Sequence, residues 1–347
     1  MKKAVLILFI ILPCIITAAV FTTADNTLSE QENRTLMTRG SISKTVKDGG
    51  FQEDLEKYLS DQFPFREQLV YLQSGVRYAA GQREIGGAYI CPDGRLIQKI
   101  TPADINDGAL LSYADKINSI AAKHKVYVMY VPSACSVLSE ELPRGAVAYD
   151  YDELFNSLNA RLGNAETVNL KEKMQNADYY YKTDHHWNAY GAYNAYTVFC
   201  KMKGEAPKKL EEFGLKPVTE GFKGTLSSKV PVIKTADEIL LPGVPALEVT
   251  ADGAKTDFYD LSALEKKDKY NVFQGGNHGI TQIVNPKGNG KTLLVLKDSF
   301  ANSFVPYLAG EYSEIIMLDE RYTFISLEDF VDKANPDEVL VLREITN

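Results

Sequence analysis

The sequence predicts an α/β protein in which helices flank a parallel β-sheet, with a β-containing insertion and an N-terminal helical segment. Four continuous apolar runs of strand length predict the sheet, at residues 126–131, 292–296, 314–318 and 338–342. Strands buried on both faces have this continuous apolar character, whereas half-exposed strands alternate. Segments with helical periodicity separate the runs, and this alternation is typical of βαβ units.

Composition agrees with an ordinary globular protein. The 347 residues are enough for one large or two modest domains, and 45% of them are hydrophobic. The net charge of -8 argues against a nucleic-acid partner, because no basic surface is available to neutralise phosphates. The four cysteines are widely spaced and form neither a disulfide framework nor a zinc motif.

The N-terminus predicts export. Lys2 and Lys3 precede an apolar run over residues 4–21, which is long for a signal-peptide core and short for a spanning helix. Residues 1–24 are therefore either a cleaved signal peptide or a membrane anchor, and the rest of the chain is expected outside the cytoplasm. Residues 25–84 are expected to form a tether and a helical segment that Pro64 interrupts.

The main domain is expected over residues 85–347. Its remaining elements are predicted, in chain order, as a hairpin at 88–97, a helix at 112–124, a helix at 151–162, a short strand at 167–170 and a helix at 188–202. Residues 205–285 break this rhythm with five prolines and short β-like pieces, and we interpret them as an insertion on the α/β core.

Several polar residues directly follow predicted strands. They are Ser133, Ser299, Arg321 and Glu344. In open α/β sheets, ligands bind beyond the carboxyl ends of the strands, so these residues are expected at one site. Ser299 is the candidate nucleophile, because a strand-to-helix junction exposes a hydroxyl near the amides of a helix N-terminus. The alternative is that Asp298 and Ser299 only cap the helix.

The segment Asp184-His185-His186-Trp187 holds two of the four histidines and the only tryptophan. On an extended chain, residues two apart point to the same side, so Asp184 can orient His186 as a general base while His185 points away. Asp184 could instead cap the following helix. A metal site made by Asp184, His185 and His186 is also open, but adjacent histidines on an extended chain diverge, so we predict no metal and no cofactor.

Two further residues are candidates around a reacting group. Asn277, in the sequence Gly275-Gly276-Asn277-His278, is either a second oxyanion donor or part of a turn, and His278 is the rival base. Arg321 is predicted to bind a carboxylate or sugar hydroxyls, with an ion pair to Asp319 or Glu320 as the alternative.

These motifs resemble the DHHW family of exported bacterial proteins. The resemblance extends to other motifs along most of the chain, namely Glu32-Asn33-Arg34, Asp61-Gln62-Phe63-Pro64-Phe65-Arg66, Gly224-Thr225-Leu226, Lys297-Asp298-Ser299-Phe300 and Arg321-Tyr322. The family is similar to the SGNH-hydrolase-like domains of alginate O-acetylation proteins, which use an Asp-x-His pair and a later serine. The resemblance implies catalytic roles for Asp184, His186 and Ser299. The alginate proteins usually have glycine where Lys297 stands, and the resemblance leaves His185 unassigned.

The expected function is therefore an exported O-acetyltransferase or acetylesterase acting on a cell-surface or secreted polysaccharide. Ser299, His186 and Asp184 are its expected catalytic residues. The candidates for oxyanion stabilisation or substrate binding are Asn277, Arg321, Tyr322, His185 and Trp187. The resemblance also implies a membrane-bound acyltransferase that supplies acetyl groups. The alternative function is a non-catalytic glycan-binding or assembly protein of a polysaccharide export system.

Overall fold

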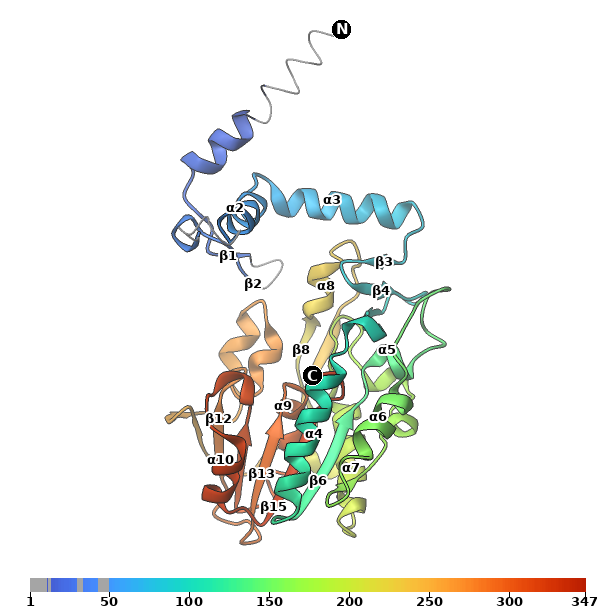
Figure 1. Cartoon of the computed structure of the whole chain (residues 1–347), viewed down its shortest axis with the longest axis vertical. Helices are drawn as coiled ribbons and strands as arrows, with labels where there is room; N and C mark the ends of the chain where they lie inside the picture. Colours follow the sequence, from blue (N-terminus) through green and yellow to red (C-terminus); the bar gives the residue numbers. More distant parts are fainter. Residues whose placement is uncertain (1–10, 12–13, 30–33, 43–49) are drawn as a thin grey trace. The chain divides into compact units, whose positions relative to one another are not determined.

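The structure is a computed structural model that describes residue 11 and residues 14–29, 34–42 and 50–347 (Figure 1). These residues form two compact units. The first unit comprises the chain up to Ile85 together with Ser228–Ile233, and the second comprises Gly86–Ser227 and Lys234–Asn347.

The first unit is built mainly from two helices. Helix α2 spans Gly50–Asp61 and helix α3 spans Arg66–Ala79. Pro64 and the left-handed backbone of Phe65 (φ 58°) separate them, as predicted from the proline. Short strands β1 (Leu28–Ser29) and β2 (Arg34–Thr35) pair antiparallel, and β3 covers Glu84–Ile85.

Within the described residues, no helix has both the length and the apolar character needed to cross a bilayer. Half of the predicted signal peptide or anchor, residues 1–10 and 12–13, lies outside the described residues, as do Glu32 and Asn33. Export therefore stays a prediction.

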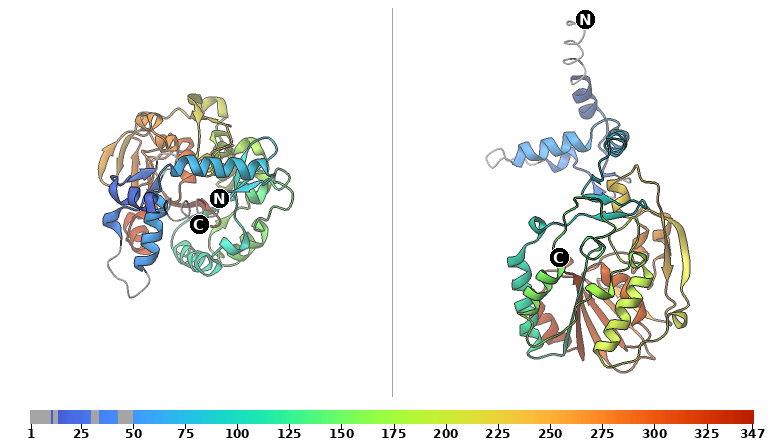
Figure 2. Two further views of the ribbon diagram at one scale, coloured as in Figure 1. Left: turned by 90° about the horizontal axis from the view of Figure 1, so that it is seen from above. Right: turned by 90° about the vertical axis from the view of Figure 1, so that its right-hand side faces the viewer.

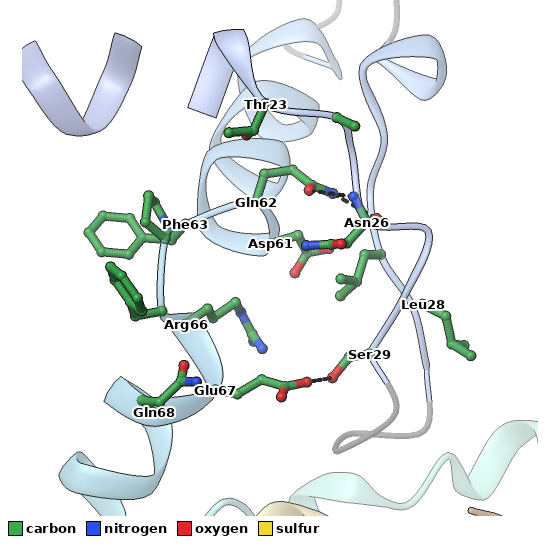
Figure 3. Close-up of a pocket in the computed structure, with 14 residues that line it drawn as sticks. Thr23, Asn26, Leu28, Ser29, Asp61, Gln62, Phe63, Arg66, Glu67 and Gln68 are labelled. Atoms are coloured by element: carbon green, nitrogen blue, oxygen red, sulfur yellow. Dashed lines mark hydrogen bonds between the residues drawn. The ribbon is translucent and has the colours of Figure 1, made fainter. Parts of the chain in front are cut away.

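A pocket of about 540 Å³ lies within the first unit (Figure 3). Two buried polar side chains at the end of α2, Asp61 and Gln62, line it. The Gln62 amide exchanges two hydrogen bonds of 2.9 Å with the Asn26 backbone and donates a third to the Met37 carbonyl at 2.8 Å. Asp61 accepts from the Met37 backbone N–H at 2.8 Å. These side chains satisfy the backbone groups of the extended segment beside α2.

The second unit contains an eight-stranded sheet in the order β11-β10-β12-β14-β13-β15-β6-β7. The strands are β6 (Val126–Val131), β7 (Glu166–Thr167), β10 (Glu248–Ala251), β11 (Ala254–Thr256), β12 (Ile280–Val284), β13 (Thr292–Lys297), β14 (Glu314–Leu318) and β15 (Glu338–Glu344). The strands from β14 to β7 in this order are parallel, and β12, β10 and β11 continue the sheet in antiparallel pairing. The predicted α/β class with a mostly parallel sheet is confirmed.

One expectation about the later part of the chain needs correction. The segment 205–285, interpreted as an insertion on the core, supplies β10, β11 and β12 to the main sheet itself. This difference comes from pairings between strands distant in sequence, such as β12 with β14, which local patterns do not reveal.

Helices cover both faces of this sheet, with α4 on one side and α7 on the other (Figure 2). The helices are α4 (Asp107–Ala121), α5 (Ala134–Val137), α6 (Tyr151–Asn159), α7 (Ala189–Met202), α8 (Thr225–Lys229), α9 (Phe300–Phe304) and α10 (Leu327–Ala334). Helix α4 begins earlier than predicted because the Asn106 side chain caps it at Ala109. The central strands β13 and β15 are almost wholly buried, as their continuous apolar sequences require.

Smaller strands lie outside the main sheet. Strands β4 (Ala88–Ile90) and β5 (Leu96–Gln98) form the predicted hairpin. Strands β8 (Lys216–Phe222) and β9 (Asp237–Leu241) pair antiparallel with two irregularities. Gly224 and Thr225 lie between these strands at the start of α8, and both contribute to the candidate site.

Candidate active site

Ser299 lies just beyond the carboxyl end of β13, at the start of α9. Its neighbour Asp298 is buried and fixes this junction. One Asp298 oxygen accepts from the Phe300 backbone N–H at 2.9 Å, and the other accepts from the Glu344 backbone N–H at 2.7 Å. Asp298 therefore caps α9, whereas the Ser299 side chain makes no capping bond and stays available for another partner.

The partner of Ser299 is His186, which reaches it from a distant part of the chain. His186 Nε2 lies 2.7 Å from Ser299 Oγ, and His186 Nδ1 lies 2.6 Å from Asp184 Oδ1. The same Asp184 oxygen accepts the His186 backbone N–H at 3.1 Å. The structure thus brings the three predicted residues into one hydrogen-bonded series from carboxylate to imidazole to hydroxyl.

Asp184 is held as an ionised group. Burial favours its neutral form, but the charges of His185 and His186 and the hydrogen bonds from His186 and Thr225 outweigh burial and lower the Asp184 pKa well below its ordinary value. Thr225 donates its backbone N–H at 2.8 Å and its hydroxyl at 3.0 Å to Asp184 Oδ2. Gly224 is required here, because a Cβ at that position would lie 2.3 Å from Asp184.

The prediction that His185 points away from His186 is wrong. The two rings are 3.9 Å apart, and His185 Nδ1 lies 3.1 Å from Thr225 Oγ1 and 3.4 Å from Asp184 Oδ1. The reason is the backbone, which bends instead of running extended and returns on itself through a Tyr181 N–H bond to the His186 carbonyl. Adjacent side chains at a bend need not diverge.

This bend also brings three metal-ligand types together. One ligand atom each from Asp184, His185 and His186 lies within 4.8 Å of the others. However, both ring nitrogens of His186 already face hydrogen-bond partners, so an ion bound to His186 would have to displace Asp184 or Ser299. The donor set fits a proton relay better than a metal centre.

Tyr270 is a site residue that sequence reasoning missed. Its ring stacks on the His186 imidazole at 4.1 Å and 7°. Its hydroxyl donates to the Ser299 carbonyl at 3.1 Å and lies 3.1 Å from Ser303 Oγ. Tyr270 therefore fixes both the plane of the imidazole and the turn that carries the serine. It is one of twenty tyrosines and lies in no motif, so no local signal marks it.

Trp187 was expected near substrate, and the structure corrects this expectation. Its side chain is fully buried, and its indole N–H donates to Ser303 Oγ at 2.9 Å and to the Phe300 carbonyl at 3.1 Å. Trp187 therefore joins the histidine segment to α9 from the interior. Both the tryptophan and Tyr270 secure the same short helix behind Ser299.

Two other candidate residues, His278 and Ser133, have hydrogen-bond partners outside the Ser299–His186–Asp184 series. His278 faces Asp252 at 3.1 Å through Nδ1 and the Gln274 carbonyl at 3.0 Å through Nε2, so it does not pair with Ser299. Ser133 is buried and donates to the Tyr149 hydroxyl at 2.8 Å.

The candidate residues at the ends of β14 and β15 also have defined surroundings. Arg321 makes a two-pronged ion pair with Asp319 at 2.8 and 2.7 Å, which is the alternative that the sequence left open. Tyr322 beside it is exposed. Glu344 is buried, and burial together with the nearby charge of Asp298 raises the pKa of its carboxyl to about 8.

Asn277 lies beside the turn that carries Ser299. Its Oδ1 accepts from Asn302 Nδ2 at 3.1 Å and from Lys297 Nζ at 3.3 Å. Asn302 belongs to α9, and its backbone N–H donates to the Ser299 carbonyl at 3.2 Å. Among the described residues, neither Asn277 Nδ2 nor the Ser299 backbone N–H has a hydrogen-bond partner.

Comparisons with known proteins identify the family. Residues 75–318 match the family described as DHHW protein. A DHHW family protein from Eubacterium siraeum has a similar structure, with a TM-score of 0.64 and 24% identity over 76% of this chain and 92% of that chain. Bacillus cereus PatB1, solved with a sulfonyl adduct, gives a TM-score of 0.59 and 20% identity over 74% of this chain and 94% of that chain.

A uricase from Haloferax volcanii is 28% identical over 131 residues, which are 38% of this chain and 42% of that protein. This chain thus spans less than half of the uricase, and the match is too short and too distant to indicate a shared activity. The family match, by contrast, covers well over half of the sequence. The chain belongs to the DHHW family.

Proposed function

We propose that this protein is an exported SGNH-like O-acetyltransferase or acetylesterase that modifies a cell-surface or secreted polysaccharide. The observation that carries the proposal is the hydrogen-bonded series Ser299–His186–Asp184 at the carboxyl edge of the sheet. Its heavy-atom distances are those expected for a nucleophile, its general base and the group that orients the base.

The reaction follows from the roles of these atoms. His186 Nε2 takes the proton of Ser299 Oγ as that oxygen attacks an acetyl carbonyl. Two donors without a partner among the described residues, the Ser299 backbone N–H and Asn277 Nδ2, are the candidates to stabilise the resulting oxyanion. When the tetrahedral intermediate collapses, His186 returns the proton to the leaving oxygen, and acetyl remains on Ser299. An acceptor hydroxyl or water then gives its proton to His186 and attacks the acetyl carbonyl. The bond from acetyl to Ser299 Oγ breaks, and His186 returns the proton to Oγ.

Asp184 does not change protonation in this scheme. Its lowered pKa keeps it ionised, so it stabilises the imidazolium that forms at each step and holds Nδ1 in the protonated tautomer. A carboxylate with four donors directed at it is well suited to this role. A non-catalytic glycan-binding protein would have no need for these three groups to lie in contact.

The polysaccharide acceptor, the membrane-bound acetyl supplier and export rest on the sequence and on its resemblance to known proteins. The basic and apolar N-terminus favours export, and the resemblance to alginate O-acetylation proteins favours a glycan acceptor. The similar fold of PatB1, which was solved with a sulfonyl adduct, supports an activated nucleophile, because sulfonyl reagents modify such groups.

The test is hydrolysis of an aryl acetate by the purified protein. Ser299→Ala should lower kcat by about 10³-fold or more, with unchanged folding. Ser133→Ala is the matched control, because Ser133 also follows a core strand but has no contact with His186, so this variant should retain activity. Equal activity of wild type and Ser299→Ala would overturn the proposal. Transfer to an oligosaccharide, followed by mass spectrometry, then separates transferase from esterase.

A further inference from the structure

Lys297 is an unusual residue for the end of a central strand. Its side chain is only 2% exposed, and it lies two residues before the proposed nucleophile. Burial lowers the pKa of its amine, against the attraction of Asp319 and Asp298. A buried lysine is costly unless its donors are matched, so its surroundings should explain its presence.

Three acceptors surround the Lys297 amine, which matches the three donors of an ammonium group. Nζ lies 2.8 Å from Asn302 Oδ1, 3.3 Å from Asn277 Oδ1 and 3.5 Å from Asp319 Oδ2. Asp319 is itself fully buried and is held on its other side by Arg321. The lysine is thus fixed by a carboxylate and two carboxamides.

An ammonium group has no acceptor, so it dictates which end of each carboxamide faces it. Asn302 must turn Oδ1 to Lys297, which leaves its Nδ2 to donate to Asn277 Oδ1 at 3.1 Å. Asn277 Oδ1 then receives both Asn302 and Lys297. The opposite end of Asn277, Nδ2, is left as an unused donor beside the Ser299 turn.

We infer that Lys297 is a positioning residue that sets the rotation of the Asn277 carboxamide, so that Nδ2 is presented to the oxyanion formed at Ser299. This inference rests on the proposed function. A donor fixed before the reaction stabilises developing charge without reorganisation during the reaction. Without Lys297, the Asn277 amide can rotate by half a turn and present an oxygen instead, which would repel the oxyanion.

The kinetic test is a double-mutant cycle on aryl acetate hydrolysis. Lys297→Met keeps the aliphatic stem and removes the donors, and it should lower kcat by about 10²-fold while KM changes by less than about threefold. Asn277→Ala should give a loss of similar size. The double variant should lose no more than the worse single variant, because both changes remove one donor. If the fold-losses in kcat of the two single variants multiply in the double variant, Lys297 does not act through Asn277.

Lys291→Met is the matched control. Lys291 immediately precedes β13, is half-exposed and pairs with Glu338, so its loss should leave kcat within about twofold. If Lys297→Met does not fold, Asn302→Ala replaces it, because it removes the other donor to Asn277 Oδ1 and should lower kcat by about tenfold at unchanged KM. No effect of Asn302→Ala on kcat would overturn the inference.

A second measurement needs no activity. The side-chain amide NMR signals of Asn277, assigned by their loss in Asn277→Asp, should be one sharp pair in the wild type. In Lys297→Met they should broaden or shift, whereas identical signals would overturn the inference. If the wild type hydrolyses no ester but these signals respond to Lys297, then the proposed function fails and the positioning contact stands.

Discussion

Glu344 offers a test of the site's electrostatics that does not depend on knowing the substrate. It is buried next to Asp298, and its carboxyl has a pKa of about 8 in the folded protein against an ordinary value of 4.5. Because the folded pKa is raised, the folded protein keeps a proton between pH 4.5 and 8 that the unfolded chain releases. The free energy of unfolding therefore falls as pH rises through this window.

The size of the effect follows from the two pKa values. One unit of pKa corresponds to about 1.4 kcal/mol, so the full penalty above pH 8 is about 5 kcal/mol, and about 4 kcal/mol of it develops between pH 5 and 8.5. Glu344→Gln has no titrating group and no such penalty. We therefore expect Glu344→Gln to gain about 4 kcal/mol of stability relative to wild type between pH 5 and pH 8.5.

Urea denaturation of wild type and of Glu344→Gln at pH 5 and at pH 8.5 measures this difference. The contributions of all other titrating groups are the same in both proteins and cancel. Glu338→Gln on the same strand is the matched control, and its difference from wild type should not change between pH 5 and pH 8.5. Its carboxylate contacts Lys203 and Lys291, and its pKa is lowered, so it stabilises the protein above pH 4.5 and this contribution is lost as pH falls. A pH-dependent difference below about 1 kcal/mol for Glu344→Gln would refute the reasoning.

Three further outcomes are expected. His186→Ala should lose as much kcat on an aryl acetate as Ser299→Ala, whereas His278→Ala should stay near wild type, and the reverse result would assign the base to His278. Gly224→Ala should destabilise the protein by about 1–3 kcal/mol in thermal denaturation and abolish hydrolysis, because its Cβ would overlap Asp184, while the open position Gly221→Ala should do neither. Arg321→Ala should weaken transfer to a glycan acceptor more than hydrolysis of a small acetyl ester, because the guanidinium is 43% exposed beside the ion pair. Equal loss of both activities, together with a lowered Tm, would show that Arg321 has only a structural role, through its ion pair with Asp319.

Much of the sheet could be predicted because the sequence pattern of each buried strand is local. Strand β14 has the predicted bounds, and β13 and β15 start at the predicted residues. A strand buried on both faces must be continuously apolar, and that pattern is visible in a short window of sequence. The antiparallel strands β10 and β12 were not assigned to this sheet, because their place depends on pairing with β14, more than thirty residues further on from β12.

The residues of the candidate site likewise divide into those that could be predicted from local sequence and those that could not. Ser299 could be predicted because it follows a buried strand, and Asp184 and His186 because their spacing suits an orienting carboxylate and a base. His185 was misplaced because adjacent side chains diverge only on an extended backbone, and the chain bends at this point. Tyr270 and Thr225 were missed as site residues because each acts through contacts with residues distant in sequence, His186 and Ser299 for Tyr270 and Asp184 for Thr225.

The segment 205–285 therefore has a larger part in the site than its irregular sequence suggests. It provides Thr225, which holds Asp184, Tyr270, which stacks on His186, and Asn277, which is directed by Lys297. The core strands provide only Ser299 and the buried residues beneath it. Since this segment secures the orienting carboxylate through Thr225, and the base and the nucleophile through Tyr270, a change there alters the geometry of the reacting atoms. Divergence among DHHW proteins in this segment is thus the place to look for differences in rate as well as in acceptor.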